Sequence, residues 1–200
     1  NTQNMILRCH MELKPEARML GRDCEAVGGY LMEQDCEPVA MQDEALDNVL
    51  AQIEMQPSET RIQPQRRLSG APQTNSWVPS SISTLVGSPD TLDWNKVFSG
   101  ISSVTLPVGN EASKVRLVRA EPDAKSPNHE HRGMEATLVL DGSFTDSTGE
   151  YSRGDLVIID DPLIDHSPVA SAETGCICMV VSTAPIKLKG WASMLNPFLR

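Results

Sequence analysis

The spacing of apolar residues changes once along this chain, from the period of a helix to that of a strand. In the first part, Leu20, Cys24, Val27 and Leu31 follow one another at steps of four, three and four, which places them on one face of a helix. From Trp77 onward, short β-branched segments alternate with Gly, Pro, Asp and Asn turns. The sequence therefore predicts two domains, a helical one followed by a β domain.

The helical domain is predicted to cover residues 1–56, with three helices over residues 3–13, 17–34 and 42–56. Three short helices form only a marginal core, so we expect this domain to depend on a partner. The apolar face of the last helix consists of Leu46, Val49, Leu50 and Ile53.

Residues 57–76 are rich in proline and glutamine and lack periodicity, which is typical of a linker. Residues 77–200 then contain five strand-like segments at regular spacing, which favours an antiparallel sandwich or barrel. The predicted fold class is thus α+β and multidomain. The five segments are "ISSVTLPV", "SKVRLVRAE", "EATLVLDG", "EYSRGDLVIIDD" and "GCICMVVSTA".

Charge and composition exclude several classes of protein. The net charge is −10 without a basic cluster, which argues against direct nucleic-acid binding and suits a basic protein partner, or simply solubility. No apolar run is long enough to cross a membrane. The five cysteines form no disulfide-like array, and the first residues do not look like a secretory signal. We therefore expect a cytoplasmic protein.

Three of the four histidines gather in one part of the sequence. His129 and His131 are two residues apart and project to the same side of an extended segment, so they can hold one ion together. Glu135 begins the next strand, and His166 is the expected fourth ligand. This set suits Zn, Mn, Fe, Ni or Cu. The alternative is that a polar loop contains these histidines by chance.

The glycine framing of these residues resembles the paired motifs of the cupin family. In "HEHRGMEATLVLDG", a His-x-His is followed by Glu after three residues and by Gly after six more. In "GDLVIIDDPLIDH", a Gly leads through a Pro to His166. The Asn that often follows this last histidine is replaced by Ala170. The resemblance implies a jelly roll that binds metal through His129, His131, Glu135 and His166.

The order of segments along nearly the whole chain resembles ChrR-type anti-sigma factors. The helical stretches "RCHMELKPEARMLGRDCEAVGGYLMEQ" and "DEALDNVLAQIE" precede a linker and a cupin that ends in "GCICMVVSTAPIKLKGWASMLNPFLR". The resemblance implies a non-enzymatic protein whose helical domain sequesters an extracytoplasmic-function sigma factor. It also implies a zinc-binding cupin sensor domain that is needed for release under oxidative stress, by singlet oxygen or organic hydroperoxides.

Other interpretations remain open beside this one. The same ligand set supports dioxygenases or isomerases in other cupins, with Fe, Mn or Ni in place of zinc. A further alternative is a relative whose helical domain has lost sigma binding. Cupins also often pair through sheet edges, so a homodimer is one option.

The chain departs from the ChrR pattern at a second zinc site that the family has in its helical domain. His10 is present, but Lys14 and Ala17 occupy the positions of two cysteine ligands. Neither side chain can bind zinc at neutral pH, so we predict no zinc there. A replacement site built from His10 with Cys9, Cys24 and Cys36 is the alternative.

Two smaller features near the metal motif have more than one interpretation. Cys176 and Cys178 resemble the family's Cys-Ile-Cys strand and lie on one strand face, either as a packed core pair or as thiols that are oxidised near the metal. Asp160, Asp161 and Asp165 either orient a ligand imidazole or are solvated turn residues.

Overall fold

The computed structural model of the chain describes residues 2–35, 39–55, 77–110, 113–160, 165–190 and 192–194. The predicted linker, Cys36, Asp161 and most of the C-terminal stretch lie outside these ranges. The described chain groups into two compact units. One comprises Asn1–Arg22 and Ser76–Arg200, and the other comprises Asp23–Asn75.

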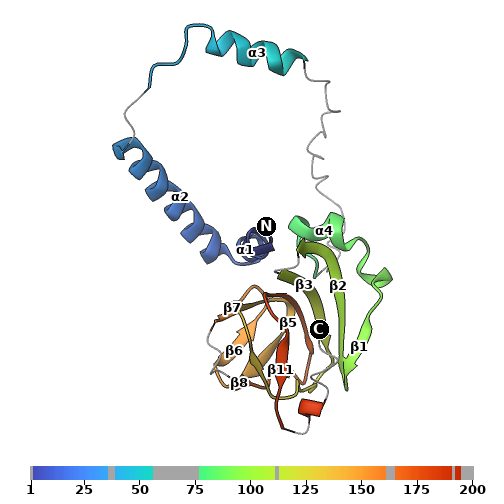
Figure 1. Cartoon of the computed structure of the whole chain (residues 1–200). Coiled ribbons are helices and arrows are strands. Elements are labelled where there is room, and N and C mark those ends of the chain that lie inside the picture. The colour runs from blue at the N-terminus through green and yellow to red at the C-terminus, as the bar shows by residue number, and fades with distance from the viewer. Residues whose placement is uncertain are drawn as a thin grey trace. The chain divides into compact units, whose positions relative to one another are not determined.

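The three predicted helices are confirmed, and a short fourth helix opens the β part of the chain (Figure 1). No helix of the described residues has the length and apolar character of a membrane span. The helices are α1 (Thr2–Leu13), α2 (Pro15–Asp35), α3 (Ala45–Met55) and α4 (Ser80–Val86), and a 3-10 turn, η1, covers Pro89–Thr91.

The second part of the chain forms the predicted antiparallel jelly roll. In the described residues, the larger sheet runs in the order β1-β2-β3-β10-β5-β6, with β7 and β9 also paired to β5, and a smaller sheet runs β11-β4-β8. The strands are β1 (Asn95–Phe98), β2 (Ile101–Asn110), β3 (Ser113–Ala120), β4 (His129–His131), β5 (Glu135–Asp146), β6 (Gly149–Ser152), β7 (Leu156–Ile159), β8 (Asp165–His166), β9 (Val169–Ala170), β10 (Cys176–Ser182) and β11 (Ile186–Leu188).

The predicted segment over residues 150–161 is two strands rather than one. A turn at residues 153–154 separates β6 from β7, and Gly154 there has a φ of 90°, which a side chain would strain. The turn lets β6 and β7 both pair with β5, at different ends of that long strand.

Both faces of the larger sheet are apolar along β10, which explains why this strand has no charged residue. On β10, Cys176, Cys178 and Val180 belong to a cluster inside the barrel. The intervening residues Met179 and Val181 are fully buried in a second cluster on the outer face. Because strand side chains alternate between faces, this outer face needs a cover of its own.

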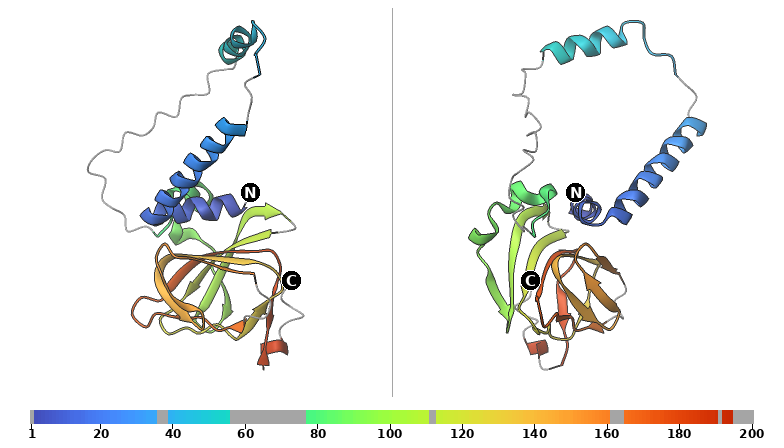
Figure 2. Two further views of the ribbon diagram at one scale, coloured as in Figure 1. Left: turned by 90° about the vertical axis from the view of Figure 1, so that its left-hand side faces the viewer. Right: turned by 180° about the vertical axis from the view of Figure 1, so that it is seen from behind.

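Helices α1 and α4 provide that cover (Figure 2). From α1, Ile6 and Cys9 are buried, and from α4, Ile82 and Val86 are buried, all in the cluster that contains Met179. The first predicted helix therefore packs on the β domain. The predicted boundary at residues 57–76 lies outside the described residues and stays a prediction.

Polar contacts at the end of α1 reinforce this packing. The Glu12 carboxylate accepts hydrogen bonds from the backbone N–H groups of Ser80 (2.6 Å) and Ser81 (3.0 Å), so it caps the first turn of α4. Burial raises the pKa of Glu12, but the hydrogen bonds from Ser80 and Ser81 outweigh it, and the pKa lies below its ordinary value. The α1–α4 contact is therefore held by an ionised carboxylate at neutral pH.

Candidate metal centre

The candidate metal centre lies where β4, β5 and β8 meet. In the smaller sheet, His129 on β4 is the direct partner of His166 on β8. This pairing brings two side chains that are 37 residues apart in the sequence next to each other. His131 lies two residues after His129 and shares its face of β4, as predicted. Glu135 begins β5, just after the turn that follows β4.

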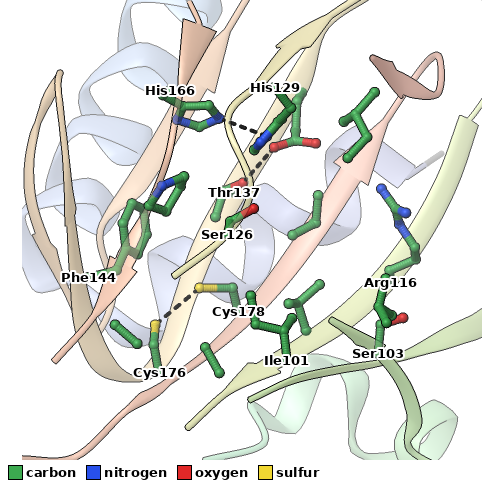
Figure 3. Close-up of a pocket in the computed structure, with 18 of the residues that line it drawn as sticks. Ile101, Ser103, Arg116, Ser126, His129, Thr137, Phe144, His166, Cys176 and Cys178 are labelled. Carbon is green, nitrogen blue, oxygen red and sulfur yellow. Dashed lines mark hydrogen bonds between the residues drawn. The ribbon is translucent and has the colours of Figure 1, made fainter. Parts of the chain in front are cut away.

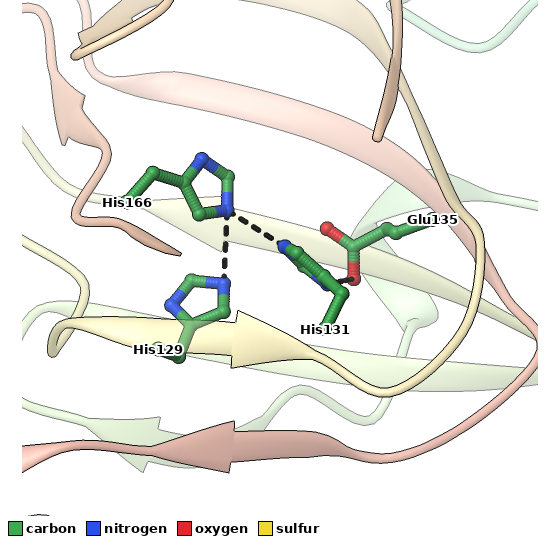
Figure 4. A group of neighbouring side chains, drawn as sticks. All are labelled: His129, His131, Glu135 and His166. Carbon is green, nitrogen blue, oxygen red and sulfur yellow. Dashed lines mark hydrogen bonds and ion pairs between the residues drawn. The ribbon is translucent and has the colours of Figure 1, made fainter. Parts of the chain in front are cut away.

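These strands bring all four sequence-predicted site residues together (Figure 4). One ligand atom from each of His129, His131, Glu135 and His166 lies within 4.8 Å of the others, and all four residues are buried. The Nε2 atom of His166 is 2.9 Å from Nε2 of His131 and 3.1 Å from Nε2 of His129. The His131 Nδ1 is 3.6 Å from Glu135 Oε2.

The hydrogen bonds of two of these histidines show which nitrogen carries the proton. His129 Nδ1 donates to the carbonyl of Pro127 (2.9 Å), and His166 Nδ1 donates to the Asp146 carboxylate (2.7 Å). The Nε2 atoms of neutral His129 and His166 are therefore both lone-pair acceptors. Two acceptors 3.1 Å apart repel each other unless a cation lies between them.

The distances between the Nε2 atoms of the three histidines also fit a bound metal. Two nitrogens that each lie about 2.0–2.1 Å from one zinc ion, at tetrahedral or octahedral angles, are roughly 2.9–3.4 Å apart. The two Nε2 separations around His166 lie within this range. The donor set and its geometry thus fit a divalent first-row metal.

Burial keeps the imidazoles free to bind a metal at neutral pH. It lowers the pKa of His129 and of His131 to about 4, in each case with a smaller contribution from the neighbouring histidines. Burial also raises the pKa of Glu135, and the nearby Arg116 opposes this shift. Protons therefore compete weakly for the His129 and His131 nitrogens at pH 7.

The residue that orients His166 is Asp146, at the end of β5, which was not among the residues predicted from the sequence. Its Oδ2 accepts the His166 bond, while its Oδ1 accepts bonds from the backbone N–H (2.7 Å) and hydroxyl (2.6 Å) of Thr148. Of the three predicted candidates, Asp160 is exposed, and Asp161 and the side chain of Asp165 lie outside what the structure describes. The only sequence signal was an Asp at a Thr-Asp-Ser-Thr-Gly hairpin turn.

A cavity of about 180 Å³ opens beside the candidate metal-site residues inside the barrel (Figure 3). His129, Glu135 and His166 line it, so a metal held there has an open side. Most of the remaining lining is apolar and includes Phe144 and Val180.

Cys176 and Cys178 also line this cavity, with their sulfur atoms 3.3 Å apart (Figure 3). Both are free thiols. The hydrogen bond from Cys176 and burial raise the pKa of Cys178 well above its ordinary value. The sequence predicts that these thiols share one face of their strand, and the structure confirms this and turns that face toward the cavity.

His10 and Lys14, where the sequence predicts no zinc, contact the turn between β6 and β7. His10 Nδ1 donates to the carbonyl of Gly154 (2.7 Å), and Lys14 forms an ion pair with Asp155. Cys9 is fully buried on the side of α1 that packs against the barrel, and burial raises its pKa to about 12. These contacts give each residue a structural role in attaching α1 to the barrel.

Comparison with known proteins identifies the family. Residues 83–185 match the family described as the ChrR cupin-like domain. The chain is 33% identical to the anti-sigma-E factor ChrR of Cereibacter sphaeroides over 98% of its length and 88% of that protein. It also superposes on the crystal structure of Rhodobacter sphaeroides SigE in complex with the anti-sigma ChrR, with a TM-score of 0.67, 32% identity, and coverage of 86% of this chain and 84% of that one. The full-length match and the shared cupin domain show that this chain belongs to the ChrR family of anti-sigma factors.

Proposed function

We propose that the chain is an anti-sigma factor that sequesters an extracytoplasmic-function sigma factor and releases it under oxidative stress. The observation that carries this proposal is the similarity to ChrR along 98% of the chain, together with a solved complex of ChrR and SigE. The helices α2 and α3 are the proposed sigma-binding surface.

The exposed apolar residues of these helices support that assignment. Val27 and Leu31 on α2 are more than half exposed, and so is Ile53 on α3. Helices with an apolar face normally bury it, and a partner can supply the cover. Hydrophobic contact with a sigma factor would give these side chains the burial that the described residues do not provide.

The test of this surface uses two isoleucines with the same exposed fraction. Ile53 on α3 and Ile158 on β7 are both 59% exposed. Each extracytoplasmic-function sigma factor of the source organism is co-expressed with the tagged chain, and the partner that co-purifies is used for affinity measurements. We expect Ile53→Gln to weaken binding about tenfold or more, as for a residue at the centre of an interface, and Ile158→Gln to leave it unchanged. If no such sigma factor co-purifies, the proposed function is wrong.

We further propose that His129, His131, Glu135 and His166 bind one zinc ion. Their spacing, burial and lone-pair arrangement support a metal, and membership of the ChrR family favours zinc. Elemental analysis of the purified chain should find about one zinc per chain, with none in the His129→Ala variant. Two zinc ions per chain would instead indicate a second site that includes some of Cys9, Cys24 and Cys36.

The cavity beside the cluster supports one alternative function, a metal-dependent cupin enzyme such as a dioxygenase or isomerase. The described titratable residues that line it, apart from the cluster itself, are Arg116, Cys176 and Cys178. An arginine is not a general base, and the raised pKa of Cys178 keeps that thiol protonated at neutral pH. This lining favours binding over turnover. Stoichiometric iron or manganese in place of zinc would favour the enzyme.

A further inference from the structure

Arg116 is the only arginine among the described residues that line the cavity, and it lies on the inner face of the barrel. Its neighbours on β3, Val115 and Leu117, are fully buried in the cluster on the outer face, so alternation along the strand turns Arg116 inward. Figure 3 shows its side chain at the cavity, on the side opposite Phe144.

The guanidinium of Arg116 is incompletely paired. Its Nε is buried and has no hydrogen-bond partner among the described residues. Glu135 is close enough for Arg116 to lower its pKa, yet the described residues form no ion pair between the two. A buried N–H without a partner is unfavourable, so this arrangement suits a ligand that brings its own acceptor.

The apolar walls set the size and character of the rest of the ligand. The cavity of about 180 Å³ is larger than the roughly 150 Å³ engineered cavity that binds benzene. A ring or chain of about six carbon atoms therefore fits. Its apolar part would lie against Phe144, Val180 and Ala170, away from the guanidinium.

A carboxylate is the head group that this arrangement favours. The guanidinium is planar and presents its N–H groups as a fork that matches two carboxylate oxygens. A singly charged carboxylate needs fewer donors than a phosphate, and the described cavity lining offers few besides Arg116, mainly the hydroxyls of Ser103, Ser126 and Thr137. An uncharged apolar ligand would leave the Nε of Arg116 without a partner.

We propose that this cavity binds a small monocarboxylic acid, with the carboxylate on Arg116 and the apolar chain or ring along the barrel interior. The acid lies next to the candidate metal centre and the two thiols. Binding of the acid in the cavity does not depend on the anti-sigma role. Any effect of the acid on sigma release rests on the proposed function.

The test compares hexanoate with hexan-1-ol, which share an apolar chain and differ in the charged head. Binding of each to the full chain is measured by calorimetry, both as purified and after removal of metal with a chelator. We expect hexanoate to bind about tenfold or more tightly than the alcohol in both forms, because the carboxylate gains charge-assisted hydrogen bonds from Arg116.

Variants of two arginines on β3 test whether the preference for hexanoate depends on Arg116. Arg116→Gln should remove most of the preference for hexanoate while the affinity for hexan-1-ol stays the same, and Arg116→Lys should keep part of it. The matched control is Arg119→Gln, because Arg119 lies on the other face of β3, with its guanidinium 4.7 Å from the centre of the Trp94 ring. We expect this variant to bind both compounds as the unchanged chain does.

Three results would overturn the proposal. They are equal binding of acid and alcohol, binding of neither, and a preference for the acid that disappears with the metal and so belongs to the metal alone. The assay contains no sigma factor, so a negative result here leaves the anti-sigma proposal intact. Failure of that proposal would show in the co-purification instead.

Discussion

Asp146 joins the hairpin turn after β5 to the candidate metal centre. One of its oxygens accepts the hydrogen bond from His166, and the other is held by Thr148 and by the backbone N–H of Gly149 (3.2 Å). Its side chain is fully buried. Burial raises the pKa of Asp146, but the bonds from Thr148 and His166 outweigh it, so the carboxylate is ionised and fixes the His166 ring.

We therefore expect Asp146→Asn to weaken metal affinity about 10- to 100-fold, as is usual when the partner of a ligating histidine is lost. The measurement is a competition titration with a zinc chelator at pH 7. Asp141→Asn is the control, since Asp141 is half exposed and only faces Arg153 at 3.7 Å. Equal metal affinity in the Asp146 variant and the unchanged chain would show that His166 needs no such anchor.

The described cysteines should differ sharply in reactivity. Cys24 is exposed, whereas Cys9, Cys176 and Cys178 are buried. Because burial raises the pKa of Cys9 to about 12, its thiolate is scarce at pH 8, and the same holds for Cys178 with its raised pKa. Iodoacetamide should modify Cys24 within minutes and the other three only after unfolding, as followed by peptide mass spectrometry. Rapid labelling of Cys9 in the folded chain would mean that α1 leaves the barrel readily.

At the scale of elements, α1 is the unexpected part of the fold. Its apolar side packs on the outer face of β3, β5 and β10. His10 in its last turn and Lys14 just after it contact the turn between β6 and β7. A helix from the start of the chain thus completes the core of a domain that otherwise begins at residue 77.

Two neighbouring residues of α1 test this contribution. Ile6 is 3% exposed and Leu7 is 43% exposed. We expect Ile6→Ala to lower the free energy of unfolding of the barrel by about 2–4 kcal/mol, because it leaves a cavity against the sheet. Leu7→Ala should change it by less than about 1 kcal/mol. The measurement is urea denaturation followed by near-UV circular dichroism. Similar small effects of both substitutions would show that α1 contributes little to the barrel.

At the scale of the whole molecule, the buried histidines make the metal-free protein sensitive to acid. The pKa values of His129 and His131 are about 4 in the folded chain, against an ordinary 6.5. As the pH falls below 6.5, the unfolded chain takes up protons that the folded chain does not, so stability falls. Glu135 acts in the opposite direction, because its pKa is raised and its folded form binds the extra proton. Because two histidines destabilise the folded chain at lower pH and one carboxyl opposes them, the free energy of unfolding decreases overall.

We expect the free energy of unfolding of chelator-treated protein to decrease from pH 6.5 to pH 5. Each of the two histidines contributes up to about 1.4 kcal/mol per pH unit. The carboxyls with lowered pKa values, such as Glu12, add little to this slope, because their ordinary pKa of 4.5 lies below this pH range. The double variant His129→Gln/His131→Gln should show a flatter profile in urea denaturation. A flat profile for the unchanged chain would mean that these histidines are solvated without metal.

The grouping of the candidate metal-site residues could be predicted from sequence because their spacing is local. His129, His131 and Glu135 follow one another within seven residues, and the glycine that ends their motif is required by the fold: Gly142 has a φ of 67°, and a Cβ there would collide with the carbonyl of Gly175. His166 followed from the second motif. The ChrR family and the order of helical and β parts could likewise be predicted.

The remaining features depend on pairing between distant segments. Asp146 meets His166 only because a hairpin and a second sheet bring them together, and Arg116 looks in the sequence like any polar residue of an alternating strand. The pattern of α1 predicts an apolar side, but it does not state which surface covers that side. The periodicity of a strand also does not reveal that both of its faces are buried, and this is why α1 was assigned to the helical domain.

The larger sheet separates two interiors by the thickness of a single layer of backbone. Cys178 faces the cavity, and Met179, the next residue, is packed in the cluster that holds Ile6 and Cys9 of α1. Glu135 and Ala136 alternate in the same way. A shift of the backbone at either inward residue would also shift its neighbour under α1, and α1 leads directly through Lys14 into α2. A single peptide bond thus separates residues that line the cavity from residues packed against α1, the helix that precedes the proposed sigma-binding helices.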